Sequence, residues 1–309
     1  MALQLSVLDQ SPIPEGSDPG VALRNSIDLA QLAEELGYRR YWVAEHHGSK
    51  ALACTSPEVL IGPIAAATSR IRVGSGGVML PHYSPLKVAE NFRMLHGLYP
   101  GRIDLGIGRA AGTSPKVAFA LQRDKRMPAP NDFREQLDEL IGYVAGGPEL
   151  SLLGSSGESV EWAAELGLPY VFADFINPNG VGIVRPFYGG EIKRMSVAVW
   201  AICADTDAAA LRLSFSARMM MTLLFRGRFI AVPTVERAEE FLKEEGLPLD
   251  MLPVGRRIIT GDPARVRAAV EAVAADYGAE EVFLVNIIHD HAARRRSYEL
   301  IAKAFELDN

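Results

Sequence analysis

The sequence predicts a (β/α)8 barrel that forms one domain over residues 1–309. Eight runs rich in Val, Ile, Leu and aromatic residues have the composition of strands buried on both faces. Helical patterns separate most of these runs, as in a parallel barrel. No charged or low-complexity linker divides the 309 residues. The predicted strands are residues 4–9, 40–45, 71–80, 102–108, 150–154, 170–174, 195–203 and 281–287.

Four helix starts are marked by a polar residue followed by proline. The polar side chain can accept a hydrogen bond from the first turn, and proline has a helical φ already set. The four pairs are Asp18-Pro19, Ser56-Pro57, Ser84-Pro85 and Asp262-Pro263. Gly37 and Gly278 fit helix ends.

An open doubly wound sheet is the alternative fold. The pair Gly106-x-Gly108 lacks the third glycine of a dinucleotide fingerprint, and no acid follows about 20 residues later at a strand end. This absence favours the barrel.

Residues 205–261 are expected to form a helical insertion before the last βα unit, with Met219-Met220-Met221 in the core or at a subunit contact rather than in a cofactor site. Two crossovers look short. Residues 131–145 lead almost directly into the next strand, and residues 175–194 are rich in Gly and Pro without a helical period. A barrel helix is expected to be missing there.

Composition excludes several classes of function. The net charge of -6 and the pI of about 5.6 do not favour nucleic-acid binding. No run approaches 18 apolar residues, so no membrane span is expected. Cys54 and Cys203 have no motif spacing and are interpreted as free thiols in a reducing cytoplasm.

The clearest chemical signal is Glu45-His46-His47 at the end of an apolar run. Catalytic groups of parallel barrels lie at the carboxyl ends of strands, and histidine suits acid–base work near neutral pH. Adjacent residues of an extended strand point to opposite faces, so only one histidine is expected to enter a shared site. A structural role and a metal site are the alternatives, and no third metal ligand is marked.

Two further strand ends suggest a ligand. Gly74, Gly76 and Gly77 fall inside one strand, where glycine marks a close approach of the backbone to a ligand or a barrel kink. Arg109 follows another strand, and the Ser155–Ser159 stretch, SSGES, leads into a helix. A cation beside a helix start suits a phosphate, although serine there can be an ordinary cap. The His289-Asp290-His291 sequence is expected to be structural.

These motifs, in this order, resemble the bacterial luciferase-like flavin monooxygenase family. The most specific segments are VAEHH at 43–47, VGSGGVMLP at 73–81, GRIDLGIGR at 101–109 and EWAAELGLP at 161–169. The resemblance runs from the first strand to the segment 290–294 and implies the same (β/α)8 barrel.

The resemblance also implies residue roles. His46 matches the active-site histidine, and Gly76-Gly77 matches a non-proline cis peptide beneath the flavin ring. Arg109 matches the phosphate-binding arginine. Ser156 and Ser159 match the phosphate cradle, and Ala111 and Leu153 would line the isoalloxazine pocket. Two positions depart from the family pattern: Ser155 stands where luciferase has an acid, and Asp174 where an aromatic closes the flavin site.

The family resemblance implies a monooxygenase that uses reduced FMN and molecular oxygen on a small organic substrate, with reduced flavin from a separate, transient reductase. A flavin-binding protein without catalysis and a deazaflavin-dependent oxidoreductase are the alternatives. The resemblance further implies a homodimer that pairs the helices at 57–68 and 85–98.

Overall fold

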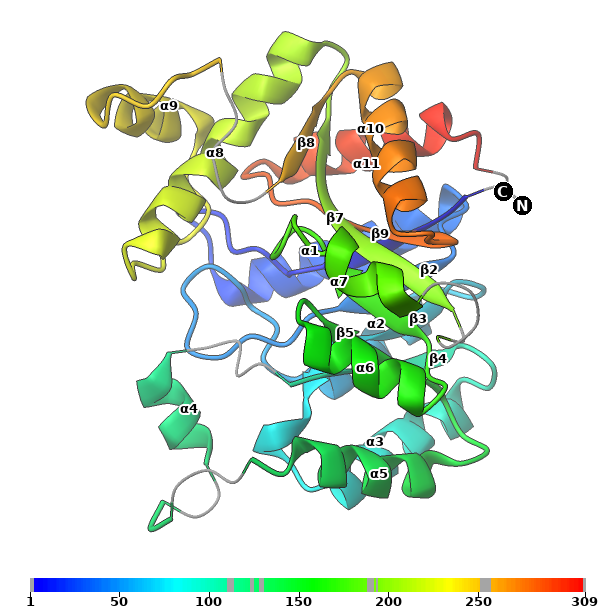
Figure 1. The fold of residues 1–309 in the computed structure, drawn as a ribbon. Helices are drawn as coiled ribbons and strands as arrows, with labels where there is room; N and C mark the ends of the chain where they lie inside the picture. Colours follow the sequence, from blue (N-terminus) through cyan, green and yellow to red (C-terminus); the bar gives the residue numbers. More distant parts are fainter. Residues whose placement is uncertain are drawn as a thin grey trace.

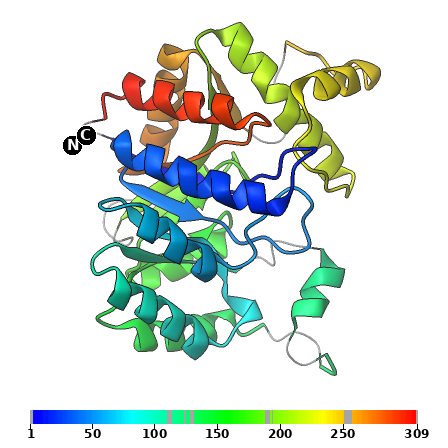
Figure 2. The ribbon, with the colours of Figure 1, turned by 180° about the vertical axis from the view of Figure 1, so that it is seen from behind.

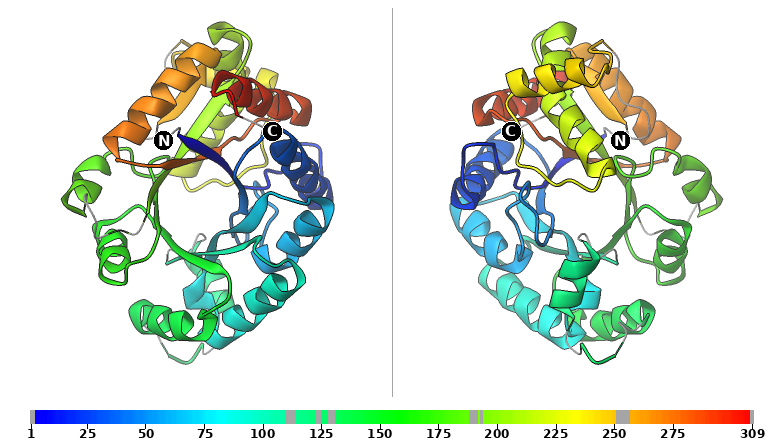
Figure 3. Two further views of the ribbon diagram at one scale, coloured as in Figure 1. Left: turned by 90° about the vertical axis from the view of Figure 1, so that its right-hand side faces the viewer. Right: turned by 90° about the vertical axis from the view of Figure 1, so that its left-hand side faces the viewer.

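A computed structural model describes residues 3–109, 114–122, 125–127, 131–187, 192, 194–250 and 257–307. Its centre is a closed parallel barrel, seen end-on in Figure 3. The barrel strands, all found at the predicted places, are β1 (Gln4–Asp9), β2 (Arg40–Val43), β3 (Arg72–Met79), β4 (Ile103–Gly108), β5 (Glu149–Gly154), β6 (Tyr170–Ala173), β7 (Met195–Cys203) and β9 (Glu281–Val285). Pairing of β6 with β7 and of β9 with both β7 and β1 closes the ring. The predicted fold is confirmed.

One strand was not predicted. β8 (Ile258–Gly261) pairs in parallel with the end of β7, beyond the part of β7 that contacts β6. Trp200 of β7 is therefore opposite Ile258 on one side and Val285 on the other. The prediction of a helical insertion over residues 205–261 is wrong at β8. Only two apolar residues, Ile258 and Ile259, mark this strand in the sequence, which is too little pattern to predict it.

The barrel helices follow one another around the outside of the ring (Figures 1 and 2). They are α1 (Pro19–Glu35), α2 (Pro57–Ala67), α3 (Pro85–Leu98), α5 (Phe133–Val144), α6 (Gly157–Glu165), α10 (Pro263–Asp276) and α11 (His291–Ala304). Each of the four predicted prolines opens a helix. The side chains of Asp18 and Asp262 accept first-turn hydrogen bonds, whereas those of Ser56 and Ser84 do not.

The two crossovers that look short in the sequence differ: residues 133–144 form the full helix α5, whereas the crossover from β6 to β7 has little helix, as predicted. The connection from β6 to β7 contains only α7 (Val181–Val184) and the 3-10 turn Arg185–Phe187 among its described residues. Four residues in α7 make about one turn of helix. The described part of this crossover thus has one turn of α-helix in place of a full barrel helix.

Three helices project beyond the carboxyl ends of the strands. They are α4 (Pro115–Leu121), α8 (Asp207–Phe225) and α9 (Val235–Glu244). The segment after α8 crosses the barrel opening (Figure 3, right). It is fixed there because Val232 donates to the carbonyl of Ile13 and Glu15 donates to that of Val232.

The three consecutive methionines, Met219–Met221, lie in helix α8. Met219 packs with α9 and Met221 with the barrel interior, as predicted, but Met220 and Met221 also line the cavity at the barrel mouth. By length and hydropathy α8 alone among the described helices could cross a membrane, but half of that window is buried in the protein. In this structure α8 serves as a packed helix over the barrel.

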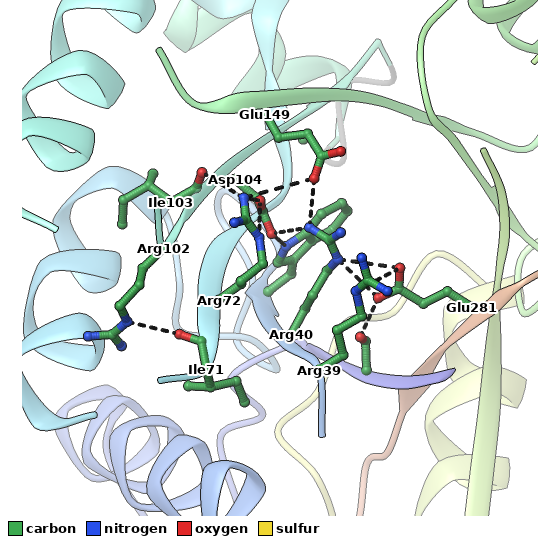
Figure 4. A network of polar contacts seen from close by, with 12 residues as sticks. Arg39, Arg40, Ile71, Arg72, Arg102, Ile103, Asp104, Glu149 and Glu281 are labelled. Carbon is green, nitrogen blue, oxygen red and sulfur yellow. Dashed lines mark hydrogen bonds and ion pairs between the residues drawn. The ribbon is translucent and has the colours of Figure 1, made fainter. Parts of the chain in front are cut away.

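The amino ends of the strands enclose a network of charged side chains (Figure 4). Arg40 donates to Asp104 at 2.7 Å, to Glu149 at 3.0 Å and to Glu281 at 3.1 Å. Arg194 contacts Glu149 at 2.9 Å, and Arg72 pairs with Asp104. Burial alone would raise the pKa of Glu149, but Arg194 and Arg40 lower it to about 2. The network fills this end of the barrel with paired charge.

Candidate active site

The end of β2 places two histidines at the barrel mouth. The buried carboxylate of Glu45 accepts from the backbone of Met79 at 3.0 Å and from the Tyr83 hydroxyl at 2.8 Å, and it lies 2.6 Å from His47 Nε2. These contacts attach the residues after β2 to the end of β3 and orient the His47 ring. Glu45 thus links the segment after β2 to the end of β3.

His46 has no such partner on one ring nitrogen. Its Nδ1 is buried and makes no hydrogen bond within the described part of the chain. Burial, with a smaller contribution from His47, lowers the pKa of His46 to about 4. The ring is therefore neutral at pH 7, and one nitrogen can accept a proton.

Both histidines line the same cavity. The prediction that only one of them would enter the site is wrong. It assumed an extended strand, but β2 ends at Val43, so the alternation of side chains does not extend to residues 46 and 47.

The glycines of β3 adopt a special conformation. The Gly76–Gly77 peptide bond is cis, and the register between β3 and β4 shifts at this point. Ser75, which the sequence analysis did not single out, bridges the two strands: its hydroxyl donates to the Gly106 carbonyl at 2.9 Å and accepts from the Gly106 amide at 3.0 Å. A Cβ on Gly77 would lie 2.8 Å from the Gly106 carbonyl oxygen. Only glycine fits there.

Leu153 lies at the end of the neighbouring strand β5. A Cβ on Gly106 would lie 2.7 Å from Leu153 Cδ1, so the two residues pack closely. The residues predicted around the flavin ring, Gly76 and Gly77 on β3 and Leu153 on β5, therefore lie on the two strands that flank β4. Ala111, also predicted there, is outside the described residues.

Arg109 follows β4 and reaches α6. Its guanidinium forms an ion pair with Glu158 in the first turn of α6 and lies 5.4 Å from the centre of the Trp162 ring. Both partners of the ion pair are substantially exposed to solvent. The predicted juxtaposition of a strand-end cation with this helix start is present.

The start of α6 has hydroxyl groups but no side-chain cap. Ser156 occupies the cap position without accepting a first-turn hydrogen bond. The Ser159 hydroxyl donates to the Ser156 carbonyl at 2.9 Å and lies 2.8 Å from the Tyr170 hydroxyl. The first amides of α6 thus remain available to an anion.

Ser155 and Asp174, the two residues that depart from the family pattern, both contact neighbouring side chains. The Ser155 carbonyl accepts from the Asn177 side chain at 3.0 Å. Asp174 is buried beside Tyr277 and Arg257; burial raises its pKa, although Arg257 opposes the effect. The next residue, Phe175, lines the cavity, so an aromatic ring does follow β6, one position after Asp174.

The cavity has a volume of about 320 Å³, within the range of small-molecule sites. Its wall combines the segments after β1, β2 and β6 with the ends of β7 and β9 and the last turns of α8. His46 lies in this wall. The other predicted site residues are absent from this wall: Gly76, Gly77, Arg109, Leu153, Ser156 and Ser159. His46 therefore lines the cavity, and the predicted phosphate-binding residues lie outside it.

Other reactive groups are accounted for. Asp290 caps α11, His291 contacts Asp28 at 2.7 Å and His289 contacts a backbone carbonyl, which confirms their structural role. Cys54 and Cys203 are buried free thiols, and burial raises the pKa of each to about 12. Over the described ranges, no three potential ligands among His, Cys, Asp and Glu are grouped to hold a metal ion.

Comparison with known proteins identifies the family. A family model described as luciferase-like monooxygenase matches residues 3–281. The chain belongs to the luciferase-like monooxygenase family. It is therefore an oxidoreductase, and the resemblance drawn from the sequence motifs is confirmed.

Individual relatives cover nearly the whole chain. YwcH of Bacillus subtilis (strain 168) is 44% identical over 98% of this chain and 99% of its own length. An N-acetyl-S-alkylcysteine monooxygenase from the same organism is 36% identical and covers 98% of each chain. The alignment to YwcH spans 333 positions, more than the 309 residues present here, so YwcH has segments that this chain lacks.

Two solved structures share the fold. The structure of apo-MsnO8 is 42% identical and has a TM-score of 0.90 over 99% of both chains. The oxygenating constituent of 3,6-diketocamphane monooxygenase from Pseudomonas putida, in complex with FMN, is 20% identical and has a TM-score of 0.75 over 99% of this chain and 98% of its own. The second comparison bears on the fold alone.

Proposed function

We propose that this monooxygenase uses reduced FMN and molecular oxygen to oxygenate a small organic substrate. Reduced flavin supplies the two electrons and two protons that let one oxygen atom enter the substrate and the other leave as water. The observation that carries this proposal is the buried, unpartnered Nδ1 of His46 in the wall of a cavity at the barrel mouth. An FMN complex of a protein with the same fold supports the choice of cofactor.

The phosphate of FMN fits the start of α6. A dianion there would meet uncapped amides, the Ser156 and Ser159 hydroxyls and the Arg109 guanidinium. To reach Arg109 it must compete with Glu158, which holds the guanidinium in the structure. Asp174, in place of an aromatic residue, does not touch this group of residues in any described contact.

The protein's own groups suit proton handling away from water. His46 is neutral because burial lowers its pKa to about 4, so it can take up a proton during the reaction and return it. Apolar side chains dominate the cavity around it, including Trp200, Met221 and Ile287. An apolar wall excludes water from the reacting groups.

One experiment separates this function from its alternatives. Under anaerobic conditions the protein is titrated with oxidised FMN, reduced FMN and reduced deazaflavin, and air is then admitted. We expect reduced FMN to bind and oxygen to be consumed in its presence. Binding of deazaflavin alone would favour a dehydrogenase, and binding of FMN without altered oxygen reactivity would favour a carrier. The thin coverage by α7 between β6 and β7 favours the carrier as second candidate.

Two partners complete the proposal. The sequence has no nicotinamide fingerprint, so a separate reductase is expected to supply reduced flavin. A second copy of the chain is expected on α2 and α3, where large apolar side chains are exposed: Val59 (69%), Leu86 (48%), Met94 (67%) and Leu98 (69%). Light scattering at micromolar concentration should give twice 33.6 kDa; a monomer would contradict the dimer.

A further inference from the structure

The cavity at the barrel mouth has an asymmetric wall. Its inner part is formed by apolar residues of the barrel and of α8, such as Trp200, Met221 and Leu224. Its outer part includes Phe229, which is half exposed, and Arg228. A ligand that fills this space needs an apolar body, because the wall offers it mainly carbon atoms.

Arg228 gives the outer part a positive charge. It is exposed at the edge of the cavity, and no described hydrogen bond or ion pair involves its side chain. No Asp or Glu is found among the described residues of the wall. The backbone under it is fixed, since Gly227 adopts a φ of 71° and the Arg228 amide donates to the Leu223 carbonyl at 2.8 Å.

Arg226, two residues before Arg228, differs from it because its side chain is paired with a carboxylate. Its two terminal nitrogens contact both carboxylate oxygens of Glu245, at 2.7 and 2.6 Å. Arg226 is thus neutralised within the protein and does not line the cavity. Two residues later, Arg228 lines the cavity without a carboxylate partner in the described chain.

Two inner groups also lack partners. The indole Nε1 of Trp200 is buried without a hydrogen bond in the described chain, and Trp200 is 5% exposed. Gln10, likewise 5% exposed, lines the cavity with no described side-chain hydrogen bond. Buried polar groups are normally satisfied, so these two favour a ligand that carries a polar atom within its apolar body.

We propose that the substrate is an amphipathic organic acid whose carboxylate binds Arg228 and whose apolar body extends past Trp200 toward His46. A guanidinium binds a carboxylate through two parallel hydrogen bonds, and these are strengthened when an apolar ligand removes water from the cavity. Binding at Arg228 fixes which end of the molecule reaches the inner part. This assignment of substrate class rests on the proposed function of the same cavity.

The test uses two ligands of equal length, octanoate and octanamide. Their binding to the whole protein is measured by calorimetry for the wild type, for Arg228→Gln and for the matched control Arg226→Gln. We expect the wild type and Arg226→Gln to bind octanoate at least about tenfold more tightly than octanamide, a difference of about 1.4 kcal/mol. In Arg228→Gln this preference should disappear.

Three results would overturn the assignment: equal binding of the two ligands by the wild type, binding of neither ligand, or a preference that survives in Arg228→Gln. FMN affinity is measured on the same three proteins. If FMN fails to bind while the preference for octanoate depends on Arg228, the anion site stands and the flavin proposal fails. If FMN binds normally without that preference, the flavin proposal stands and the substrate class is wrong.

Discussion

The two ends of the barrel treat polar groups in opposite ways. At the amino ends of the strands, the carboxylates of Asp104, Glu149 and Glu281 each contact arginine within the barrel. At the carboxyl ends, His46 Nδ1 and Trp200 Nε1 are buried without described partners. At the amino end the charged groups pair with one another within the protein. At the carboxyl end buried polar atoms remain without a protein partner and can bind a ligand.

This difference separates stability from function. A buried charge that loses its partner is costly, so the network at the amino end constrains the fold. Buried groups without partners beside a cavity do not stabilise the fold, and they are free to act on a ligand. At neutral pH, substitutions at the amino end should therefore change mainly stability, and those at the carboxyl end mainly binding and turnover.

The largest expected effect is on stability. Arg40→Met removes the buried cation that joins Asp104, Glu149 and Glu281 and leaves those carboxylates under-neutralised. We expect the free energy of unfolding to fall by about 3–5 kcal/mol in urea denaturation. The control is Arg134→Met, which breaks a partly exposed pair with Glu165 and should cost less than about 1 kcal/mol. Equal losses of unfolding free energy in the two variants would contradict a special role of the buried network in stability.

The second effect is on turnover. His46→Gln should leave FMN affinity intact and slow turnover roughly 100-fold or more, the scale of a positioned acid–base group. His96→Gln, on α3 and outside the cavity wall, is the control and should be unchanged. Normal turnover in His46→Gln combined with a slow His47→Gln would assign the role to the other histidine.

The third effect is a pH dependence of stability. Burial lowers the pKa of His46 from 6.5 to about 4, so as the pH falls through this window the unfolded chain takes up a proton before the folded protein does. Stability present above pH 6.5 is therefore lost toward pH 4. The full shift corresponds to about 3 kcal/mol, and contact of the ring with the cavity reduces our expectation to about 2 kcal/mol. Denaturation of the wild type and His46→Gln at several pH values measures it; parallel curves would contradict it.

The smallest effect concerns the ion pair at α6. Glu158→Gln removes a carboxylate that competes with the FMN phosphate for Arg109. Because the pair is exposed, FMN affinity should rise by less than about 1 kcal/mol, at most about fivefold. Glu161→Gln, exposed on the same helix, is the control. A weaker affinity in Glu158→Gln would mean that Glu158 helps to hold the flavin.

The sequence predicted the fold well because the barrel strands are long apolar runs and several helices begin at proline. The strand β8 was missed because only Ile258 and Ile259 mark it in the sequence and its place is decided by the end of β7. The charged network was not predicted either. Its members lie far apart in the sequence, for example Arg40 and Glu281, and only closure of the barrel brings them together.

Only some residues of the site could be predicted from the sequence. His46 and Arg109 could be predicted because catalytic and binding residues of parallel barrels lie at the carboxyl ends of the strands. Ser75, Phe175 and Arg228 were missed: each is an ordinary residue type whose role depends on a register shift, a turn or a loop crossing the barrel. Such roles come from tertiary contacts and leave no local pattern.

The central claim is that the carboxyl end of the barrel holds FMN by its phosphate at Arg109. The most direct test compares FMN with riboflavin, which lacks the phosphate, on the wild type and on Arg109→Ala. We predict that Arg109→Ala weakens FMN binding by roughly 1.5–3 kcal/mol, the range for a hydrogen bond to a charged group, and leaves riboflavin binding unchanged. Equal losses for both ligands, or no loss for FMN, would contradict the claim.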